Sequence, residues 1–97
     1  MRLTGDPARR LQALRDEAAR RRDQLSVLEE QVAYVASVAE EARVRALVSS
    51  TPLADRERRE AEEDHRRALA QRDEVAARLE EIAAEQDFLL ERMLERR

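Results

Sequence analysis

The sequence predicts an all-α fold, an antiparallel two-helix coiled-coil hairpin that pairs into a homodimeric four-helix bundle. Composition is the first indication: the 97 residues include one Gly and two Pro, while Ala, Leu, Glu and Arg dominate, as is typical of long helices and coiled coils. The second is a 3,4 repeat of apolar residues with the period near 3.5 of a coiled-coil seam. The third is a turn signal in mid-chain, which divides the repeat into two seams of similar length.

The first helix is expected over about 7–49. Asp6-Pro7 predicts its start, because a carboxylate can cap the free backbone N–H groups and Pro at the first helical position loses no hydrogen bond. From there the apolar repeat runs without a phase break. Its positions are Leu11, Leu14, Ala18, Arg21, Leu25, Leu28, Val32, Val35, Ala39, Ala42, Ala46 and Ser49.

The segment Ser50-Thr51-Pro52 predicts a turn at about 50–52, because the residue before Pro is pushed out of the α region. Thr51 is expected to cap a second helix over about 52–95. Residues 1–97 are therefore expected to form a single helical hairpin. The second seam is Ala54, Arg58, Ala61, His65, Ala68, Arg72, Val75, Leu79, Ile82, Gln86, Leu89 and Met93.

The two seams match each other when the chain folds back at the turn. Positions whose numbers sum to about 103 or 104 then meet, for example Leu14 with Leu89 and Ala42 with Ala61. A single continuous helix would instead carry Pro52 in its interior, at a cost of about 3 kcal/mol. The matched seams favour the hairpin.

The charged residues are typical of long solvated helices. Seven acids each stand four residues before a base, a spacing worth roughly 0.2 to 0.5 kcal/mol per pair on a helix surface. The pairs are Asp16 with Arg20, Glu17 with Arg21, Glu41 with Arg45, Asp55 with Arg59, Glu62 with Arg66, Glu63 with Arg67 and Glu74 with Arg78.

Charge and hydropathy exclude several classes of partner. The net charge is −3, and neither half of the chain has the positive excess on which sequence-independent nucleic-acid binding relies. No apolar run approaches the roughly 18 residues that span a bilayer. The chain has no Cys, and hence no disulfide. We expect a cytoplasmic protein that binds neither nucleic acid nor membrane.

No catalytic, cofactor or metal site can be assembled from the sequence. His65 is the only His, it falls on the seam, and without a second His or a Cys it is better explained as a core residue than as a ligand. No glycine-rich phosphate loop is present. The expectation is a protein that is not an enzyme and needs no cofactor.

Acidic residues gather just past the turn, interleaved with Arg; they are Asp55, Glu57, Glu60, Glu62, Glu63 and Asp64. Acids in the first turns of a helix favour its dipole, which is one explanation. The placement also resembles that in transcript cleavage factors of the Gre type, whose antiparallel hairpin carries tip acids into the secondary channel of RNA polymerase. That resemblance implies a regulator acting through the tip residues Ser50, Thr51, Pro52, Asp55 and Glu57. The globular domain and the tip motif of those factors have no clear match here.

Six Arg residues concentrate in the first helix: Arg9, Arg10, Arg15, Arg20, Arg21 and Arg22. They could contact phosphates, but no aromatic residues accompany them to stack bases. In a hairpin they lie beside the acids of the returning helix, which are Glu81, Glu85, Asp87, Glu91 and Glu95. Neutralisation within the hairpin is the preferred interpretation.

Large apolar residues also lie outside the seam, and several recur at helical spacing. Such rows indicate burial against further helices, although they could also widen a two-helix seam. The expected interface residues are Val27, Tyr34, Val38, Val48, Leu69, Phe88, Leu90 and Leu94, with Ala76 and Ala83 in the row of Leu69. We therefore expect a non-catalytic interaction or scaffolding protein that associates with itself as a homodimer, or binds another protein's helices through these flanks or the hairpin tip.

Overall fold

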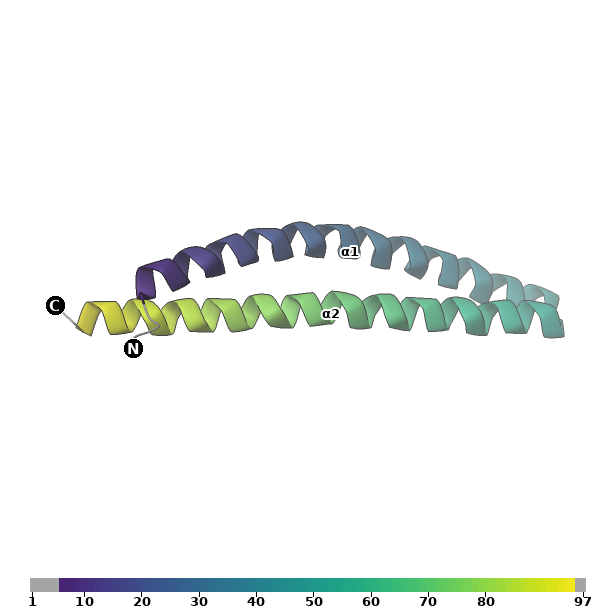
Figure 1. Ribbon diagram of the computed structural model, residues 1–97. Helices are drawn as coiled ribbons and strands as arrows, with labels where there is room; N and C mark the ends of the chain where they lie inside the picture. The colour runs from purple at the N-terminus through teal and green to yellow at the C-terminus, as the bar shows by residue number, and fades with distance from the viewer. Residues whose placement is uncertain (1–5, 96–97) are drawn as a thin grey trace.

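The protein folds as two long antiparallel helices joined by a tight turn (Figure 1). The structure is a computed structural model that describes residues 6–95. Helix α1 runs from Pro7 to Ser49 and helix α2 from Pro52 to Glu95, with no strand in the part described. The hairpin is a rod of 70 × 19 × 18 Å. The all-α hairpin predicted from composition, seam and turn is confirmed.

The helix ends are fixed by the capping residues that the sequence indicates. The Asp6 carboxylate accepts a hydrogen bond from the Ala8 N–H at 3.1 Å, and Pro7 occupies the first helical turn. The Thr51 hydroxyl accepts from the Ala54 N–H at 3.1 Å, so Thr51 is the N-cap of α2 as expected.

Ser50 ends α1 in the left-handed conformation, with φ 52° and ψ 34°, and its N–H donates to the Ala46 carbonyl at 3.1 Å. This is the geometry of a helix C-terminus that is usually occupied by Gly. Because only Ser50 and Thr51 separate the two helices, the chain reverses at once and α2 returns along α1.

The seam predicted from the 3,4 repeat is the core. Every buried residue of the described chain lies on it. These residues are Leu14, Ala18, Ala39 and Ala42 of α1 and Ala54, Ala61, Ala68, Val75 and Ile82 of α2. Most other seam positions are partly buried, whereas Ser49 is exposed.

Two clusters show how the seams face each other. At the open end Leu14 and Ala18 pack with Ile82, and Leu79 and Leu89 pack against them. Nearer the turn, Ala39 and Ala42 pack with Ala61. The expected partners Leu14 with Leu89 and Ala42 with Ala61 thus lie within the same clusters. Each seam residue inserts between several residues of the facing helix, so its neighbours extend beyond one partner.

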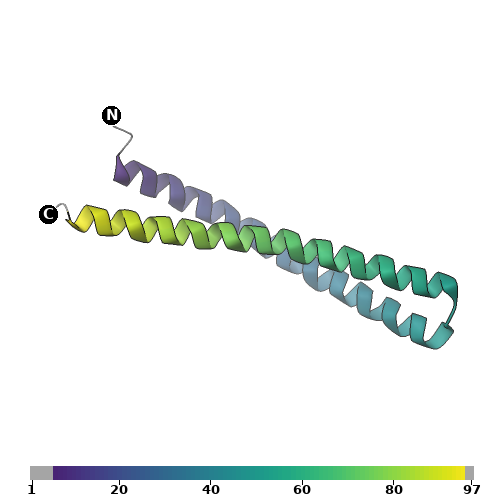
Figure 2. The same cartoon turned by 90° about the horizontal axis from the view of Figure 1, so that it is seen from below.

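Between these clusters the seam residues of α1 are less fully buried. Leu25, Leu28, Val32 and Val35 lie on the seam but remain partly exposed. In this region α1 bows relative to the straighter α2 (Figure 1), and the two helices cross (Figure 2). The middle of the core is therefore open to solvent along its α1 edge, although Ala68 and Val75 of α2 are buried there.

Three of the seven expected pairs at four-residue spacing form, namely Glu17 with Arg21, Asp55 with Arg59 and Glu63 with Arg67. The other four give way to alternative partners or do not form. Arg66 pairs with Glu63 at three-residue spacing, and Arg78 reaches across to Glu17 instead of back to Glu74. Sequence spacing alone does not choose among several acids within reach of one guanidinium.

Candidate functional site

The surface of the hairpin has two long flanks, one on each side of the seam, and they differ in chemistry. We call the first the ion-pair flank. It is formed by rows of residues seven apart, which share one face of a coiled-coil helix. The rows are Arg10, Glu17, Gln24, Gln31 and Val38 of α1 and Asp64, Gln71, Arg78, Glu85 and Arg92 of α2.

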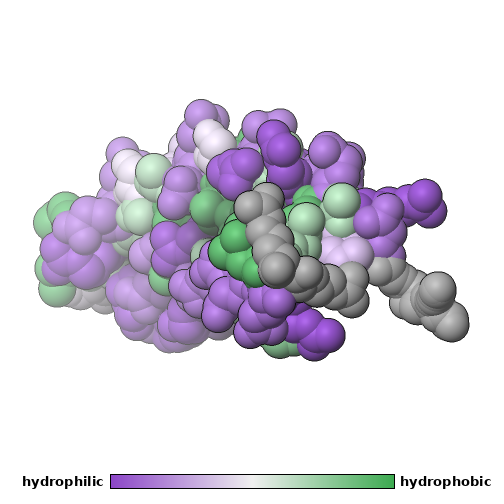
Figure 3. All heavy atoms as spheres, turned by 90° about the vertical axis from the view of Figure 1, so that its left-hand side faces the viewer, coloured by the Kyte–Doolittle hydropathy of each residue, from purple (hydrophilic) through white to green (hydrophobic). Residues whose placement is uncertain are grey.

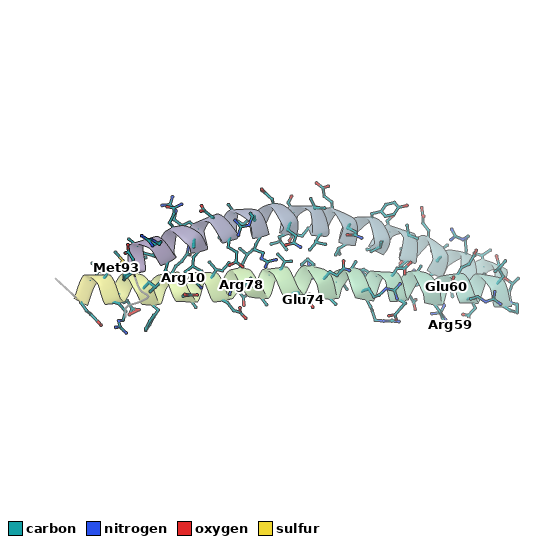
Figure 4. All side chains as sticks on the ribbon, in the orientation of Figure 1. Arg10, Arg59, Glu60, Glu74, Arg78 and Met93 are labelled. Atoms are coloured by element: carbon teal, nitrogen blue, oxygen red, sulfur yellow. The ribbon has the colours of Figure 1, made fainter. Side chains whose placement is uncertain are left out.

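Two ion pairs cross between the helices on this flank, and both are bidentate. Arg10 donates from Nε and Nη2 to Glu85 at 2.7 and 2.9 Å. Arg78 donates from Nε and Nη2 to Glu17 at 2.7 and 2.8 Å. Figure 4 labels Arg10 and Arg78, whose side chains lie where the two helices face each other. These pairs fix the relative register of α1 and α2 near the open end.

The pairs shift the acidity of their members. Hydrogen bonding from Arg78, supported by Arg21, lowers the pKa of Glu17 from 4.5 to about 2. Hydrogen bonding from Arg10 lowers the pKa of Glu85 below its usual value. Both carboxylates are therefore ionised at neutral pH and serve as ion-pair partners, not as proton donors.

Farther along the ion-pair flank lies an open depression of about 270 Å³. It is lined by Gln31, Val35, Asp64, Arg67, Ala68 and Gln71. Gln31 and Val35 of α1 thus face Asp64, Ala68 and Gln71 of α2 across it. The lining is mostly polar and the depression opens to solvent, so it is not an enclosed pocket for a small molecule.

We call the opposite side the alanine flank. On α2 it carries the row Leu69, Ala76, Ala83 and Leu90, and on α1 the row Arg15, Arg22, Glu29, Ala36 and Arg43. Hydrogen bonding to Glu40 raises the pKa of Arg43, and the charge of Glu62 on α2 adds to this effect. Within residues 6–95 no ion pair joins the helices on this flank.

The eight expected interface residues are mostly exposed, but they do not share one face. Val27, Tyr34 and Val48 are 63%, 69% and 80% exposed, and they lie on the outer side of α1 next to the ion-pair flank. Val38 and Leu69 are partly buried, and Val38 packs against the Ala39 cluster. The remaining three, Phe88, Leu90 and Leu94, are exposed near the open end.

Large apolar side chains therefore reach solvent along the whole rod. Among residues 6–95, nine of them are at least 45% exposed: Val27, Tyr34, Val44, Leu47, Val48, Leu53, Phe88, Leu90 and Leu94. Viewed from the open end, apolar side chains come to the surface between charged ones (Figure 3). Arg92 lies over the Phe88 ring, 5.5 Å from its centroid, and covers part of it.

The hairpin tip combines exposed polar and apolar groups. Ser50, Thr51 and Pro52 are exposed. Asp55 pairs with both Arg58 and Arg59, and hydrogen bonding from Arg58 lowers the pKa of its carboxyl group. Glu57 and Glu60 are exposed, and within residues 6–95 neither forms an ion pair. Four exposed apolar residues surround the turn, and they are Val44, Leu47, Val48 and Leu53.

The Arg-rich segment of α1 is neutralised only in part. Among its six Arg residues, Arg10 pairs with Glu85 and Arg21 pairs with Glu17. Within residues 6–95 the other four, Arg9, Arg15, Arg20 and Arg22, form no ion pair. The expected neutralisation by acids of the returning helix thus accounts for Arg10 alone.

Other expected features have simple placements. His65 is partly buried on the seam of α2. Among the described residues, no three His, Asp or Glu side chains are grouped so as to hold a metal ion. Neither α1 nor α2, over its described length, has a segment apolar enough to cross a membrane.

The sequence alone places Arg10 beside Glu85 among the acids of the returning helix, but it did not lead us to expect the pair of Arg78 with Glu17. A signal for both pairs is present, because Arg10 and Glu17 are seven apart, as are Arg78 and Glu85. Each row has Arg first and Glu second along the chain, so two antiparallel helices set each Arg against a Glu. In an antiparallel coiled coil such rows face each other beside the seam. Assigning each charge to its row would have found this flank.

Comparison of the chain with known protein families, curated proteins and solved structures returned no match.

Proposed function

We propose that this protein is a non-catalytic interaction module, a rigid helical hairpin that associates with itself and offers its remaining apolar surface to another protein. The observation that carries the proposal is the exposure of nine large apolar side chains on a rod with a narrow core. A two-helix hairpin needs only its seam to be apolar. Apolar surface beyond the seam is stabilising once another helix covers it, at roughly 25 cal/mol per Å².

The partly exposed middle of the seam supports the same proposal. Leu25, Leu28, Val32 and Val35 are core residues by position, yet two helices alone leave them partly open to water. A homodimeric four-helix bundle covers such edges with additional helices. The depression near Gln31 is open and mostly polar, which does not favour an enclosed catalytic site.

The test is the mass of the protein in solution, measured by light scattering across a series of micromolar concentrations. The chain has a mass of 11.3 kDa, and we expect twice that value. Circular dichroism on the same samples reports whether the helices are formed. A fully helical monomer at every concentration would refute self-association.

A double variant at two exposed positions separates an apolar contact from a general loss of folding. Val27→Glu with Tyr34→Glu places charge on exposed positions, and the helices should stay intact. Val38→Glu is unsuitable for this purpose, because Val38 packs against the seam cluster. If the exposed outer face of α1 binds another protein, the double variant should lose that partner while it keeps its helix content.

A second candidate function, a transcription regulator acting in the manner of Gre factors, has narrower support. It rests on the exposed carboxylates of Glu57 and Glu60 at the tip. Asp55 is already occupied by Arg58 and Arg59, which makes it a poor ligand for a metal ion in another active site. Binding of the purified hairpin to RNA polymerase, compared with a variant carrying Glu57→Ala and Glu60→Ala, tests this function.

A further inference from the structure

We propose that the partner of the alanine flank is a second copy of this chain, docked so that both turns lie at the same end of the dimer and α1 of each copy packs on α2 of the other. This inference rests on the proposed self-association and specifies its geometry. It is supported by two features of this flank: the charges on α1 are opposite to those on α2, and both helices carry small residues beside these charges.

The charges on the alanine flank are complementary between α1 and α2. Arg15 and Arg22 are exposed on α1, and Glu80 and Asp87 are exposed on α2, each pair seven residues apart. Within residues 6–95 none of these four side chains forms an ion pair. The hairpin thus presents a row of two positive charges and a row of two negative charges, with the same spacing and on the same side.

Small residues lie beside these charges, four positions away and hence on the same helix face. Ala19 and Ser26 follow Arg15 and Arg22 on α1. On α2, Ala76 and Ala83 precede Glu80 and Asp87. Small side chains let two helix backbones approach closely, which brings the long Arg side chains within reach of the facing carboxylates.

The register follows from the hairpin itself. Within one copy Ala18 is level with Ile82, since both belong to one core cluster. In a dimer with both turns at one end, α1 of the partner passes α2 at this same level. The partner's Ala19 then lies beside Ala83 and its Ser26 beside Ala76. The partner's Arg15 lies near Asp87 and its Arg22 near Glu80.

The alternative twofold arrangement places the turns at opposite ends. It packs α1 on α1 and α2 on α2 through the same flank. With the two rods fully overlapped, Arg15 and Arg22 of each copy would then face the turn half of the partner's α1, and Glu80 and Asp87 would face the turn half of the partner's α2. The positive row and the negative row would no longer meet. Charge complementarity therefore selects the arrangement with both turns at the same end.

Charge reversal tests the contact directly. A variant carrying Arg15→Glu and Arg22→Glu should dimerise at least about tenfold more weakly, and so should a variant carrying Glu80→Arg and Asp87→Arg. When the two variants are mixed, opposite charges meet at both contacts, and native mass spectrometry should show the heterodimer restored. A variant carrying Arg9→Glu and Arg20→Glu has the same charge change away from this flank, and it should dimerise like the original protein.

Distances between spin labels test the orientation. The chain has no Cys, so single Cys variants at the exposed positions Arg56 and Glu91 can be labelled cleanly. With both turns at one end, the distance between the two Arg56 labels and the distance between the two Glu91 labels both stay below roughly 40 Å, a few helix diameters. With the turns at opposite ends, at least one distance reaches about 50 Å, because 35 residues of helix separate the sites.

The outcomes separate the two proposals. A folded monomer overturns self-association and this inference together. If the protein dimerises but charge reversal leaves the dimer affinity unchanged, or the label distances place the turns at opposite ends, only this inference is overturned. A dimer that is lost in the Val27→Glu and Tyr34→Glu variant, yet tolerates reversal at Arg15 and Arg22, places the interface on the other flank and also overturns it.

Discussion

Truncation of Leu14 to Ala is expected to remove a large part of the stability of the hairpin. Leu14 has no exposed surface and packs in a cluster with Ala18 and Ile82. The substitution deletes three carbons, worth about 2.4 kcal/mol at roughly 0.8 kcal/mol each, and the cavity adds to this. The expected loss is therefore about 2–5 kcal/mol, out of roughly 5–15 kcal/mol for a domain of this size.

The assay is urea unfolding followed by circular dichroism at one fixed protein concentration, because association adds to apparent stability. With a slope of about 1–3 kcal/mol per M, the midpoint should fall by at least about 0.7 M. Val27→Ala is the matched control, since Val27 is 63% exposed and its truncation should change stability by no more than about 0.5 kcal/mol. Equal shifts for the two variants would refute the assignment of the core.

Three further predictions concern the ion pairs, the turn and the tip. Because Arg78 lowers the pKa of Glu17 to about 2, their pair stabilises the fold above about pH 4.5, and this contribution is lost as the pH falls toward 2. Thermal unfolding should therefore show a lower Tm for Glu17→Gln at pH 7, with the difference from the original protein vanishing near pH 2. At the turn, Ser50→Gly should raise the free energy of unfolding by about 1 kcal/mol, since Gly adopts φ 52° without strain. Thr51→Ala should lower it by about 1 kcal/mol, because the cap of α2 is lost. Urea midpoints that move in the opposite directions would contradict the turn geometry. Finally, Glu57→Ala should leave the urea midpoint within about 0.5 kcal/mol of the original, because the side chain is exposed and unpaired within residues 6–95; a larger loss would show that this acid is structural and not available to a partner.

The ends of the helices were predictable because they depend on short-range chemistry. Asp6 and Thr51 cap the two helices through hydrogen bonds to residues two and three positions away, and such contacts can be inferred from local sequence. The seam was predictable for a related reason, since the 3,4 repeat assigns each residue to a face without knowledge of the partner helix.

The candidate site was predictable only in part. The sequence identified Val27 and Tyr34 as apolar residues outside the seam, and both are exposed. It grouped Val38 with them, but Val38 packs on the Ala39 cluster, because its position beside the seam leaves it partly covered by α2. Asp55 was expected as an exposed tip acid, and the choice of Arg58 and Arg59 as its partners depends on side-chain reach in three dimensions.

The sequence by itself determined the two helices, their caps, the turn and the faces that form the core, because each depends on spacing along the chain. Only the tertiary structure decided which charges pair across the hairpin. It joins Arg10 to Glu85 and Glu17 to Arg78 on one flank, and within residues 6–95 it gives Arg15 and Arg22 on the other flank no such partner. The physical reason is that a guanidinium can pair with any carboxylate within a few Å. Which carboxylates are that close is set only once α2 lies against α1 in a fixed register.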